Sequence, residues 1–397
     1  MTLTNRRSFL KKAVVGGGLI AGAAGTFSRR ISAAGETEFN RIAYRQLGST
    51  GYIVSEIGFG AMNTRDAELV HAAIDSGINY LDTAHSYMNG VNEEIIGSVM
   101  KTKRDRVFLT TKIKFDNNGI DIKDMPGMLE KSVKRLQTDH VDLVLLHVTD
   151  RREHILRNDI MNIFQDYKKK GLTRFIGVST HSNQAEVLNA AVESKHWEAA
   201  LVGYNYYSPP NVPAAIKRAR EAGLAIIGMK NLLDTKSLPW KNLRDFRKNP
   251  SETLNLKQAL IKWVLEDRYV DATIPGMTSF EQLADDIAVM GTKFTFDDNR
   301  SERRYSFNTV DDGYCRGVAG CTGCREKCPK GVQIHEINRC LRYAYGYGDY
   351  GLAMENYSSL PRSSRLDICG DCDECAVVCV NGLNLTDRIR KAHELFI

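Results

Sequence analysis

The first 314 residues contain no cysteine, and all nine cysteines of the 397-residue chain lie between Cys315 and Cys379. The first 34 residues lack Asp and Glu but hold six Lys and Arg, so the rest of the chain carries 48 basic and 48 acidic side chains. No long Lys/Arg run follows residue 34, so the sequence shows no concentration of positive charge of the kind that binds nucleic acid. A 43% hydrophobic and 26% charged composition also excludes a disordered, collagen-like or polytopic membrane protein. The uneven cysteines predict two chemically different modules.

The first 34 residues combine a basic head, a weakly apolar stretch from Ala13 to Gly25 and a small-residue end. That stretch is shorter than the roughly 20 residues of a membrane span, and its glycines would weaken a buried helix. A targeting segment is therefore favoured over a core helix or a membrane anchor. The pair Arg6-Arg7, followed by Phe9-Leu10-Lys11, resembles a twin-arginine export signal. The resemblance implies recognition by the twin-arginine translocase, export of a folded cargo, and a place in the periplasm or on the outer face of the cytoplasmic membrane.

Residues 42–290 alternate short apolar runs with segments of helical periodicity, the pattern of parallel βα units. Eight runs are strand candidates: SEIGFGAM, NYLDTA, VFLTTKI, VDLVLLH, RFIGVST, ALVGYNY, LAIIGMK and ATIPGM. Eight units in about 250 residues predict an α/β fold, a (β/α)8 TIM barrel. The competing doubly wound sheet normally has a glycine-rich phosphate loop after its first strand. The segment GFGAMNTRD does not match that fingerprint.

Polar residues at the carboxyl ends of these strands are the first candidates for catalysis, because barrel enzymes place their chemistry there. The second, third and fourth strand candidates end at Asp82, Lys112 and His147, and Tyr87 follows the second by a short loop. An ammonium near a phenol lowers the pKa of the phenol, a carboxylate orients the ammonium, and an imidazole can hold a substrate oxygen. Each residue alone has an ordinary structural interpretation. Their order on successive strands predicts proton transfer by Tyr87 during interconversion of a carbonyl and an alcohol.

The residues that carry this pattern also carry a family resemblance. The stretches YRQLGSTGYIVSEIGFGAMN, AIDSGINYLDTAHSYMNGVNEEIIGSVM, DRVFLTTKI and SVKRLQTDHVDLVLLH resemble the aldo/keto reductase family over about residues 42–290. The resemblance implies an oxidoreductase acting on a small-molecule carbonyl or alcohol, with a sugar as one candidate. It also implies a role for each of the four residues. The Asp82 carboxylate orients the Lys112 ammonium, and Lys112 adjusts the pKa of Tyr87. Tyr87 donates the proton, and His147 orients the carbonyl.

The same resemblance implies a nicotinamide cofactor, NAD or NADP, with no preference between them. The family's cofactor-binding positions correspond to Ser179, Thr180, Tyr204, Met229, Lys230, Gly276 and Thr278. Two of the family's usual anchors are absent: Leu201 stands where a glutamine commonly holds the carboxamide, and Thr278 or Ser279 where a basic residue often binds a 2'-phosphate. Asp285 and Asp286 add negative charge near the expected anionic ligand.

A polar segment, residues 291–314, is predicted to be a linker to the tail, residues 315–397. The tail contains C-x2-C-x2-C-x3-C, the spacing of bacterial iron-sulfur proteins, and an earlier copy whose first gap is stretched to five residues. Three thiolates at this spacing wrap one cubane, and the fourth usually serves the neighbouring cluster. We therefore predict one [4Fe-4S] cluster on Cys315, Cys321, Cys324 and Cys379, and a second on Cys369, Cys372, Cys375 and Cys328.

Other uses of these cysteines are less favoured. Nine is an odd number for disulfides, and zinc sites use two separated CxxC pairs. Two segments, IHEINRCLRYAYG and YGLAMENYSSL, are predicted to be helical, so the tail resembles a mainly helical two-cluster ferredoxin domain. Cys340, in the first of these segments, is interpreted as a small buried hydrophobic residue.

Together the modules predict an exported oxidoreductase in which electrons pass through two clusters to or from a one-electron redox partner protein or a membrane electron carrier. The clusters suit this role because carbonyl chemistry moves two electrons and each cluster carries one. Two alternatives remain open at this stage. One is an electron-carrier or redox-sensing protein whose barrel is a non-catalytic scaffold, and the other is a disulfide-stabilised binding protein without iron.

Overall fold

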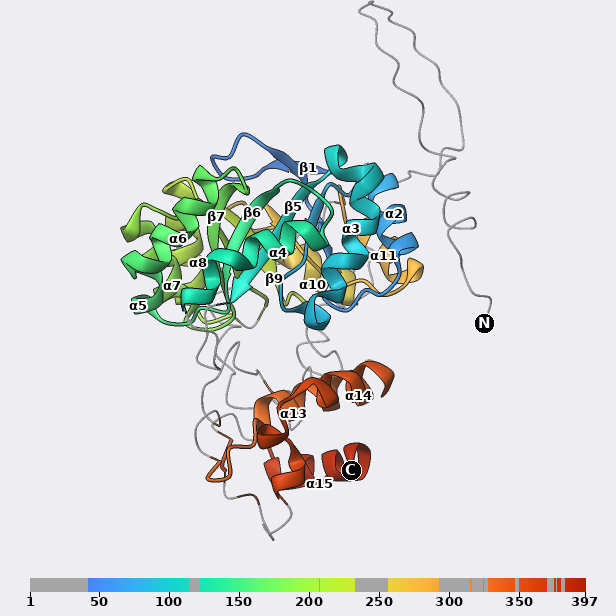
Figure 1. The fold of residues 1–397 in the computed structure, drawn as a ribbon. Coiled ribbons are helices and arrows are strands. Elements are labelled where there is room, and N and C mark those ends of the chain that lie inside the picture. The colour runs from blue at the N-terminus through green and yellow to red at the C-terminus, as the bar shows by residue number, and fades with distance from the viewer. Residues whose placement is uncertain are drawn as a thin grey trace, which may run out of the picture.

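The computed structural model describes a barrel and a smaller helical lobe (Figure 1). The described residues are 42–114, 122–206, 208–232, 256–292, 315, 324, 328–346, 350–369, 375, 377–379 and 383–397. The predicted signal, most of the predicted linker, and the predicted ligands Cys321 and Cys372 lie outside these residues. No helix in the described part is long and apolar enough to span a bilayer.

Eight parallel strands form one sheet whose order follows the chain. They are β3 (Phe59–Gly60), β4 (Tyr80–Asp82), β5 (Phe108–Lys114), β6 (Val141–His147), β7 (Thr173–Thr180), β8 (Ala199–Gly203), β9 (Ala225–Met229) and β10 (Ala272–Thr273). Parallel bridges join Ile57 to Thr273 and Gly60 to Gly276, which brings the last strand back to the first and closes the barrel. All eight predicted strands are present, and the predicted (β/α)8 fold class is confirmed.

Helices pack around the outside of the sheet (Figure 1). They are α2 (Ala67–Asp75), α3 (Val91–Lys103), α4 (Met128–Arg135), α5 (Arg152–Ile155), α6 (Asn158–Lys169), α7 (Gln184–Ser194), α8 (Asn211–Glu221), α10 (Leu256–Leu265) and α11 (Phe280–Ile287). Local chemistry sets some of their ends: the Asp66 carboxylate caps α2 by accepting a hydrogen bond from the Glu68 amide. In α4, Leu129 and Val133 occupy one face, and both are buried.

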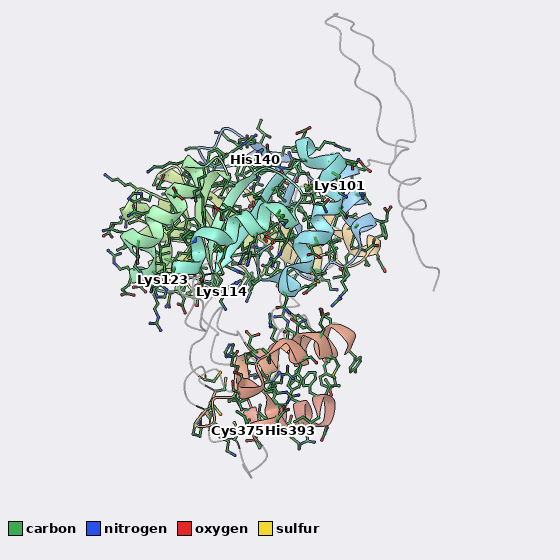
Figure 2. All side chains as sticks on the ribbon, in the orientation of Figure 1. Lys101, Lys114, Lys123, His140, Cys375 and His393 are labelled. Carbon is green, nitrogen blue, oxygen red and sulfur yellow. The ribbon has the colours of Figure 1, made fainter. Side chains whose placement is uncertain are left out.

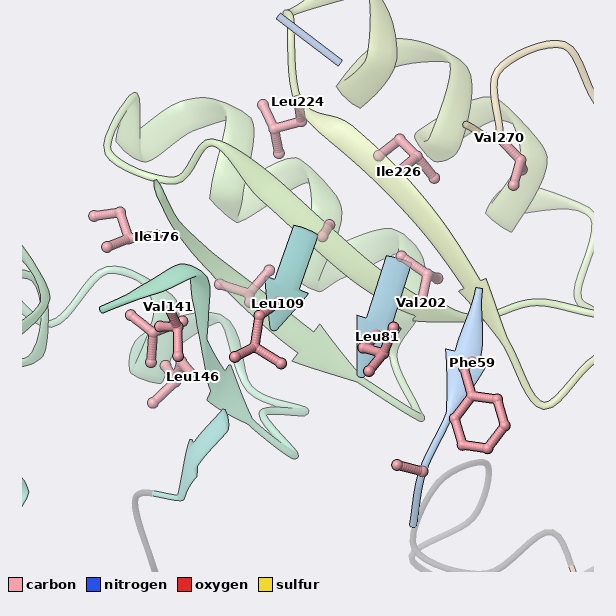
Figure 3. Packing of buried hydrophobic residues seen from close by; sticks show 14 of the residues in the cluster. Phe59, Leu81, Leu109, Val141, Leu146, Ile176, Val202, Leu224, Ile226 and Val270 are labelled. Atoms are coloured by element: carbon pink, nitrogen blue, oxygen red, sulfur yellow. The ribbon is translucent and has the colours of Figure 1, made fainter. Parts of the chain in front are cut away.

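Strand alternation divides the barrel residues between two apolar clusters. Outward side chains such as Leu81, Leu109 and Ile226 pack beneath the helices (Figure 3). Their inward neighbours, among them Tyr80, Phe108 and Leu143, fill the barrel itself. Because adjacent residues face opposite ways, the same alternation decides which residues at the strand ends point into the barrel.

A hairpin of β1 (Tyr44–Gln46) and β2 (Ile53–Ser55) covers the amino-terminal end of the barrel, and the strand candidates of the sequence did not include it. Leu47 and Val54 from the hairpin belong to the interior cluster. Gly48, with φ +52°, passes so close to Ala225 that a Cβ on it would lie 2.4 Å from the Ala225 amide nitrogen. Because the hairpin covers the amino-terminal end, an active site can form only at the carboxyl end of the barrel.

The tail forms a helical lobe with its own apolar core, built from α13 (Ile334–Leu341), α14 (Tyr350–Ser359) and α15 (Leu385–Phe396). Figure 1 shows this lobe beyond the end of the barrel opposite β1. In Figure 2, Lys114 at the end of β5 lies on the lobe's side and His140, which precedes β6, lies on the other. Two contacts from the loop after β3 join the bodies: Met62 packs on the lobe core, and Arg65 forms an ion pair with Glu355.

Candidate active site

The structure brings Asp82, Lys112, Tyr87 and His147 together at the carboxyl end of the barrel. Asp82 and His147 are the last residues of β4 and β6, and Lys112 lies on β5 between these strands. The three side chains are at most 6% exposed. Tyr87 arrives from the loop after β4, which is fixed to β5 by a hydrogen bond from the His85 amide to the Lys112 carbonyl (3.0 Å). Strand register thus assembles four residues that are far apart in sequence.

Lys112 is the centre of the group. Its ammonium donates hydrogen bonds to the Asp82 carboxylate, to the Thr83 carbonyl oxygen (2.7 Å) and to the Tyr87 hydroxyl oxygen (3.1 Å). Burial lowers the pKa of Lys112, but the Asp82 carboxylate and the Tyr87 phenol raise it, and the net direction is upward. The ammonium therefore stays charged inside the barrel end, where an unpaired charge would be costly.

The sequence predicts a lowered pKa for Tyr87, and the structure corrects that prediction. Burial raises the pKa of the phenol, and this effect exceeds the lowering by the Lys112 ammonium, although part of the Tyr87 side chain remains exposed. The net pKa lies above the ordinary value of 10.0. Tyr87 is thus a protonated phenol at neutral pH, with a cation 3.1 Å away that can stabilise the phenolate once a proton leaves.

His147 is a neutral imidazole beside this phenol. Burial, followed by the charges of Lys112 and Lys114, holds its pKa well below 6.5. The rings of Tyr87 and His147 meet edge to face with centroids 5.7 Å apart. Within the described residues, the buried Nδ1 of His147 has no hydrogen-bond partner. With its proton on Nε2, the ring can donate a hydrogen bond to an oxygen held near the Tyr87 hydroxyl.

Three further polar residues at this end were not singled out as catalytic from the sequence. The buried Ser179 and Thr149 hydroxyls and the buried Nδ1 of His181 lack hydrogen-bond partners among the described residues. Burial, followed by the charge of Lys230, lowers the pKa of His181 well below 6.5, so it too is neutral. Alternation could have identified His181, because it lies two residues after the inward-facing Ser179.

The predicted cofactor positions divide into two groups. Ser179, Met229, Lys230 and Gly276 lie at the strand ends, and Gly276 is exposed with almost nothing near its missing side chain. Thr180 and Tyr204 face the helical layer instead. The Thr180 hydroxyl donates to the Ser182 carbonyl, and the Tyr204 hydroxyl donates to Asp267 (2.9 Å) while its ring packs on Trp263.

The residues at the usual nicotinamide anchors fit such a cofactor only in part. Leu201 is fully buried in the barrel interior, so it offers no partner to a carboxamide. The Thr278 hydroxyl donates to the side chain of Gln282, and the Ser279 hydroxyl accepts from the Gln282 amide, so both serve the start of α11. Burial, followed by the charge of Asp285, raises the pKa of Asp286 to about 8. The unpartnered Ser179 hydroxyl is the observation that favours a ligand here.

Helix α13 faces the site from the lobe. Besides burial, which raises the pKa of Tyr87, and Lys112, which lowers it, the guanidinium of Arg339 also lowers it. Arg339 likewise adds to the lowering of the His181 pKa, which burial dominates. No sequence pattern indicated this electrostatic effect, because it depends on how the lobe sits on the barrel.

The cysteines gather around the core of the lobe. Six of the eight predicted ligands are described, and all six are half-buried and pack against that core: Cys315, Cys324, Cys328, Cys369, Cys375 and Cys379. No disulfide joins any two of the seven described cysteines. Within the described residues, no three potential ligands are close enough to hold a metal ion. Each predicted cluster has one ligand, Cys321 or Cys372, outside those residues.

Comparison with known proteins identifies the barrel. The model of the aldo/keto reductase family matches residues 56–304, more than half of the chain. The chain therefore belongs to the aldo/keto reductase family, and it is an oxidoreductase of that type. The match ends before Cys315, so it does not include the cysteine groups.

Individual relatives agree with this assignment. The uncharacterized oxidoreductase YqkF of Bacillus subtilis (strain 168) is 26% identical over 280 residues, which cover 61% of this chain and 89% of YqkF. Methylglyoxal reductase DkgB of Escherichia coli O157:H7 is 24% identical over 252 residues, covering 62% and 91%.

Solved structures show the same fold. An aldo-keto reductase from Bacillus halodurans in its holo form is 24% identical with a TM-score of 0.55, covering 64% of this chain and 93% of that one. One from Klebsiella pneumoniae in complex with NADPH is 22% identical with a TM-score of 0.54, covering 63% of this chain and 91% of that one. At these identities the likeness establishes the fold alone.

Proposed function

We propose that this protein interconverts a carbonyl and an alcohol on a small molecule, with Tyr87 moving the proton. The single observation that supports this most is the Lys112 ammonium, held by the buried Asp82 and lying 3.1 Å from the Tyr87 hydroxyl oxygen. During reduction the phenol gives its proton to the carbonyl oxygen, and Lys112 stabilises the resulting phenolate. During oxidation the phenolate takes the proton from the alcohol. The neutral His147 donates a hydrogen bond to the same oxygen and fixes its position.

The test is Tyr87→Phe, which removes the transferred proton and keeps the ring. General acid–base catalysis contributes about 10²- to 10⁴-fold, so kcat should fall by that factor while the thermal unfolding midpoint changes little. Activity equal to that of the unaltered protein would exclude Tyr87 as the proton donor. A protein that turns over neither carbonyl nor alcohol substrates would instead favour a non-catalytic barrel.

A nicotinamide cofactor, NAD or NADP, is part of the proposal. A solved relative is titled as a complex with NADPH, and the unpartnered Ser179 hydroxyl of this chain is buried at the barrel end. When bound, the nicotinamide supplies or accepts the hydride at the substrate carbon. Because Leu201 and Thr278 lack the usual anchoring groups, we expect weak binding and no strong preference for the 2'-phosphate. Calorimetry with NADH and NADPH measures both points.

The tail is proposed to hold two [4Fe-4S] clusters with the ligand sets predicted from the cysteine spacing. Support comes from the spacing itself and from six described ligand candidates that pack against one core. When bound, each cluster carries one electron, so two match the two electrons of the carbonyl–alcohol couple. Iron and acid-labile sulfide analysis of anaerobically purified protein tests this, with about eight of each per chain expected. Protein with the cysteines oxidised to disulfides and no iron would contradict it.

Export by the twin-arginine route completes the proposal, with the protein working in the periplasm or on the outer face of the cytoplasmic membrane. The support is the Arg6-Arg7 motif and the apolar stretch after it. Replacing the pair with Lys-Lys should leave the protein on the cytoplasmic side in a fractionation experiment. Unchanged export of the variant would count against this route.

A further inference from the structure

The β3–α2 loop, residues 61–66, carries two contacts with the lobe. Met62 packs against the apolar core of the lobe, and Arg65 forms an ion pair with Glu355 of α14. The Arg65 side chain is 55% exposed and that of Glu355 is 41% exposed, so the ion pair by itself adds little stability. Its importance lies in its place, because a displacement of the lobe acts directly on this loop.

The same loop is hydrogen-bonded to the strand end that forms the active site. The Ala61 amide donates to the Asp82 carbonyl oxygen (2.9 Å). The side-chain amide of Asn92, in the first turn of α3, donates to the carbonyl oxygens of Ala61 (2.7 Å) and Thr64 (3.2 Å). Both hydrogens of the Asn92 amide are thus used, and the residue is fully buried. These bonds fix the loop relative to the end of β4.

Asn92 also binds the residue that holds the catalytic lysine. Its Oδ1 accepts a hydrogen bond from the Thr83 hydroxyl (2.6 Å), and the Thr83 carbonyl oxygen accepts one from the Lys112 ammonium (2.7 Å). Thr83 and Asn92 are at most 1% exposed, so water does not replace the bond between them when it is broken. An unbroken series of contacts therefore runs from the lobe, through the β3–α2 loop and Asn92, to Lys112.

We propose that Asn92 and Thr83 are positioning residues that connect the docked lobe to the Lys112 ammonium. When the lobe rests on the β3–α2 loop, Thr83 is held where its carbonyl oxygen keeps this ammonium beside the Tyr87 hydroxyl. Both residues act through Lys112 and not on the substrate. The proposal rests on the carbonyl–alcohol chemistry proposed above, and it gives the lobe a part in proton transfer in addition to electron transfer.

A purely structural role for Thr83 predicts a different order of variants. If the side chain only filled space, valine, which has nearly the same shape, would replace it best, and serine, which lacks the methyl group, would be worse. If the hydroxyl holds Thr83 for Lys112, the order is reversed, because serine keeps the donor to Asn92 and valine removes it. The two substitutions therefore separate positioning from packing.

The experiment uses anaerobically purified full-length protein and the variants Thr83→Val, Thr83→Ser and the double variant Met62→Ala/Arg65→Gln. Asn92 is left unchanged, because its replacement would leave buried partners unsatisfied and destabilise the fold. KM and kcat are measured for reduction of 4-formylbenzoate, with NADPH and with reduced methyl viologen as electron donors. Hydrogen exchange with mass spectrometry reports separately on residues 61–66 and 83–92.

Asn79→Ala is the matched control. Asn79 makes the same kind of bonds at the opposite, amino-terminal end of the barrel: its side chain donates to the Ile53 carbonyl oxygen (2.9 Å) and accepts from the Ser55 amide (2.7 Å). The control therefore loses comparable hydrogen bonds without touching the series of contacts that ends at Lys112.

Thr83→Val should lower kcat about tenfold, the loss expected for one displaced hydrogen bond to a charged group, and should change KM less than about twofold. Thr83→Ser should keep most of the activity. Met62→Ala/Arg65→Gln should lower kcat in the same way and speed amide exchange in both segments. Adding Thr83→Val to it should cause little further loss, because both changes break one series of contacts. Asn79→Ala should lower the denaturation midpoint and leave kcat unchanged.

The pH profile gives a readout that a packing defect would not change. Burial raises the pKa of Tyr87, and the Lys112 ammonium lowers it. An ammonium that moves away from the phenol lowers this pKa less, so in Thr83→Val the fall of the reduction rate at alkaline pH should begin at higher pH. Thr83→Ser and Asn79→Ala should keep the profile of the unaltered protein.

A Thr83→Val variant that is as active as the unaltered protein, or more active than Thr83→Ser, would overturn the proposal and make Thr83 a packing residue. Full activity of Met62→Ala/Arg65→Gln would overturn it as well, because the lobe would then not act on Lys112. Losses that simply add in the combined variant would show two independent effects, which also contradicts the link.

The exchange measurement keeps the link testable when the chemistry is wrong. If the unaltered protein reduces no aldehyde with either donor, the carbonyl chemistry fails. Faster exchange of residues 83–92 in Met62→Ala/Arg65→Gln would then still support the link between the lobe and the site, and unchanged exchange there would overturn it. If the aldehyde is reduced and the variants behave like the control, the chemistry stands and the link fails.

Discussion

The Lys112 ammonium lies 3.1 Å from the Tyr87 hydroxyl oxygen, and the same ammonium donates to the Thr83 carbonyl oxygen across 2.7 Å. The Lys112 ammonium is therefore held in place both by Asp82 and by the loop that carries Tyr87. Because burial raises the pKa of Tyr87 above 10.0 and Lys112 only partly offsets this, the cation matters most at the moment when the phenolate forms.

Removing the cation should impair catalysis in both directions. Lys112→Met alone would leave Asp82 as an unpaired buried carboxylate, which destabilises the fold, so the informative variant combines it with Asp82→Asn. We expect kcat to fall about 10²-fold or more, with alcohol oxidation affected more than carbonyl reduction because oxidation needs the phenolate. Steady-state kinetics in both directions measure this. Equal activity of the double variant would show that Lys112 does not support Tyr87.

The pH dependence of the unaltered protein follows from the raised pKa of Tyr87. Reduction requires the protonated phenol, so its rate should stay level through neutral pH and fall only above about pH 10, where the phenol loses its proton. Oxidation requires the phenolate and should increase over the same range. A reduction rate that already falls between pH 7 and 8 would mean that Lys112 outweighs burial.

Two glycines of the amino-terminal hairpin give a matched test of the barrel closure. Gly48 (φ +52°) and Gly51 (φ +79°) both have positive φ, but only Gly48 is crowded, by the backbone of Ala225. Alanine at either position incurs about 1–2 kcal/mol of backbone strain, and at Gly48 it must also displace the hairpin from β9. We expect Gly48→Ala to lower the denaturation midpoint clearly more than Gly51→Ala in urea. Equal losses would show that the contact with Ala225 does not stabilise the fold.

Asp286 should make the barrel less stable as pH rises. Its folded pKa is about 8 and its ordinary value is 3.8, because of burial and the nearby Asp285. The folded protein therefore holds a proton that the unfolded chain has lost, and the free energy of unfolding falls by up to about 1.4 kcal/mol per pH unit between these values. Asp286→Asn should become progressively more stable than the unaltered protein from pH 4 to 8, with a constant difference above pH 8. A difference that does not vary with pH would contradict the assigned pKa.

Cluster ligation can be separated from packing by two cysteine variants. Cys324 is a predicted ligand, whereas Cys340 is fully buried in the lobe core, where burial raises the pKa of its thiol to about 12. Cys324→Ser should reduce the bound iron to about four per chain, and Cys340→Ser should leave it at about eight. Iron content measured with protein quantitation distinguishes these results. A loss of iron in Cys340→Ser but not in Cys324→Ser would show that Cys340 is the ligand and Cys324 is not.

Much of the barrel could be predicted because local patterns determine it. The apolar runs around Leu109 and Leu145 form strands whose ends must meet, so Lys112 and His147 could be placed on one rim from the sequence. The sequence could not predict the net pKa of Tyr87, because that depends on how much protein surrounds the phenol. Nor could it predict that the charge of Arg339 acts on Tyr87, since lobe docking depends on tertiary contacts such as the ion pair between Arg65 and Glu355.

The most direct test of the whole account is electron paramagnetic resonance on anaerobically purified, dithionite-reduced protein, freed of excess dithionite and mixed with a catalytic amount of NADP and an aldehyde such as 4-formylbenzoate. The account predicts a reduced [4Fe-4S] signal in both the unaltered protein and Tyr87→Phe. Addition of the aldehyde should remove the signal in the unaltered protein, with one alcohol formed for every two electrons lost, and should leave it in Tyr87→Phe. A protein without this signal, or a Tyr87→Phe variant that loses it as fast as the unaltered protein does, would contradict the account.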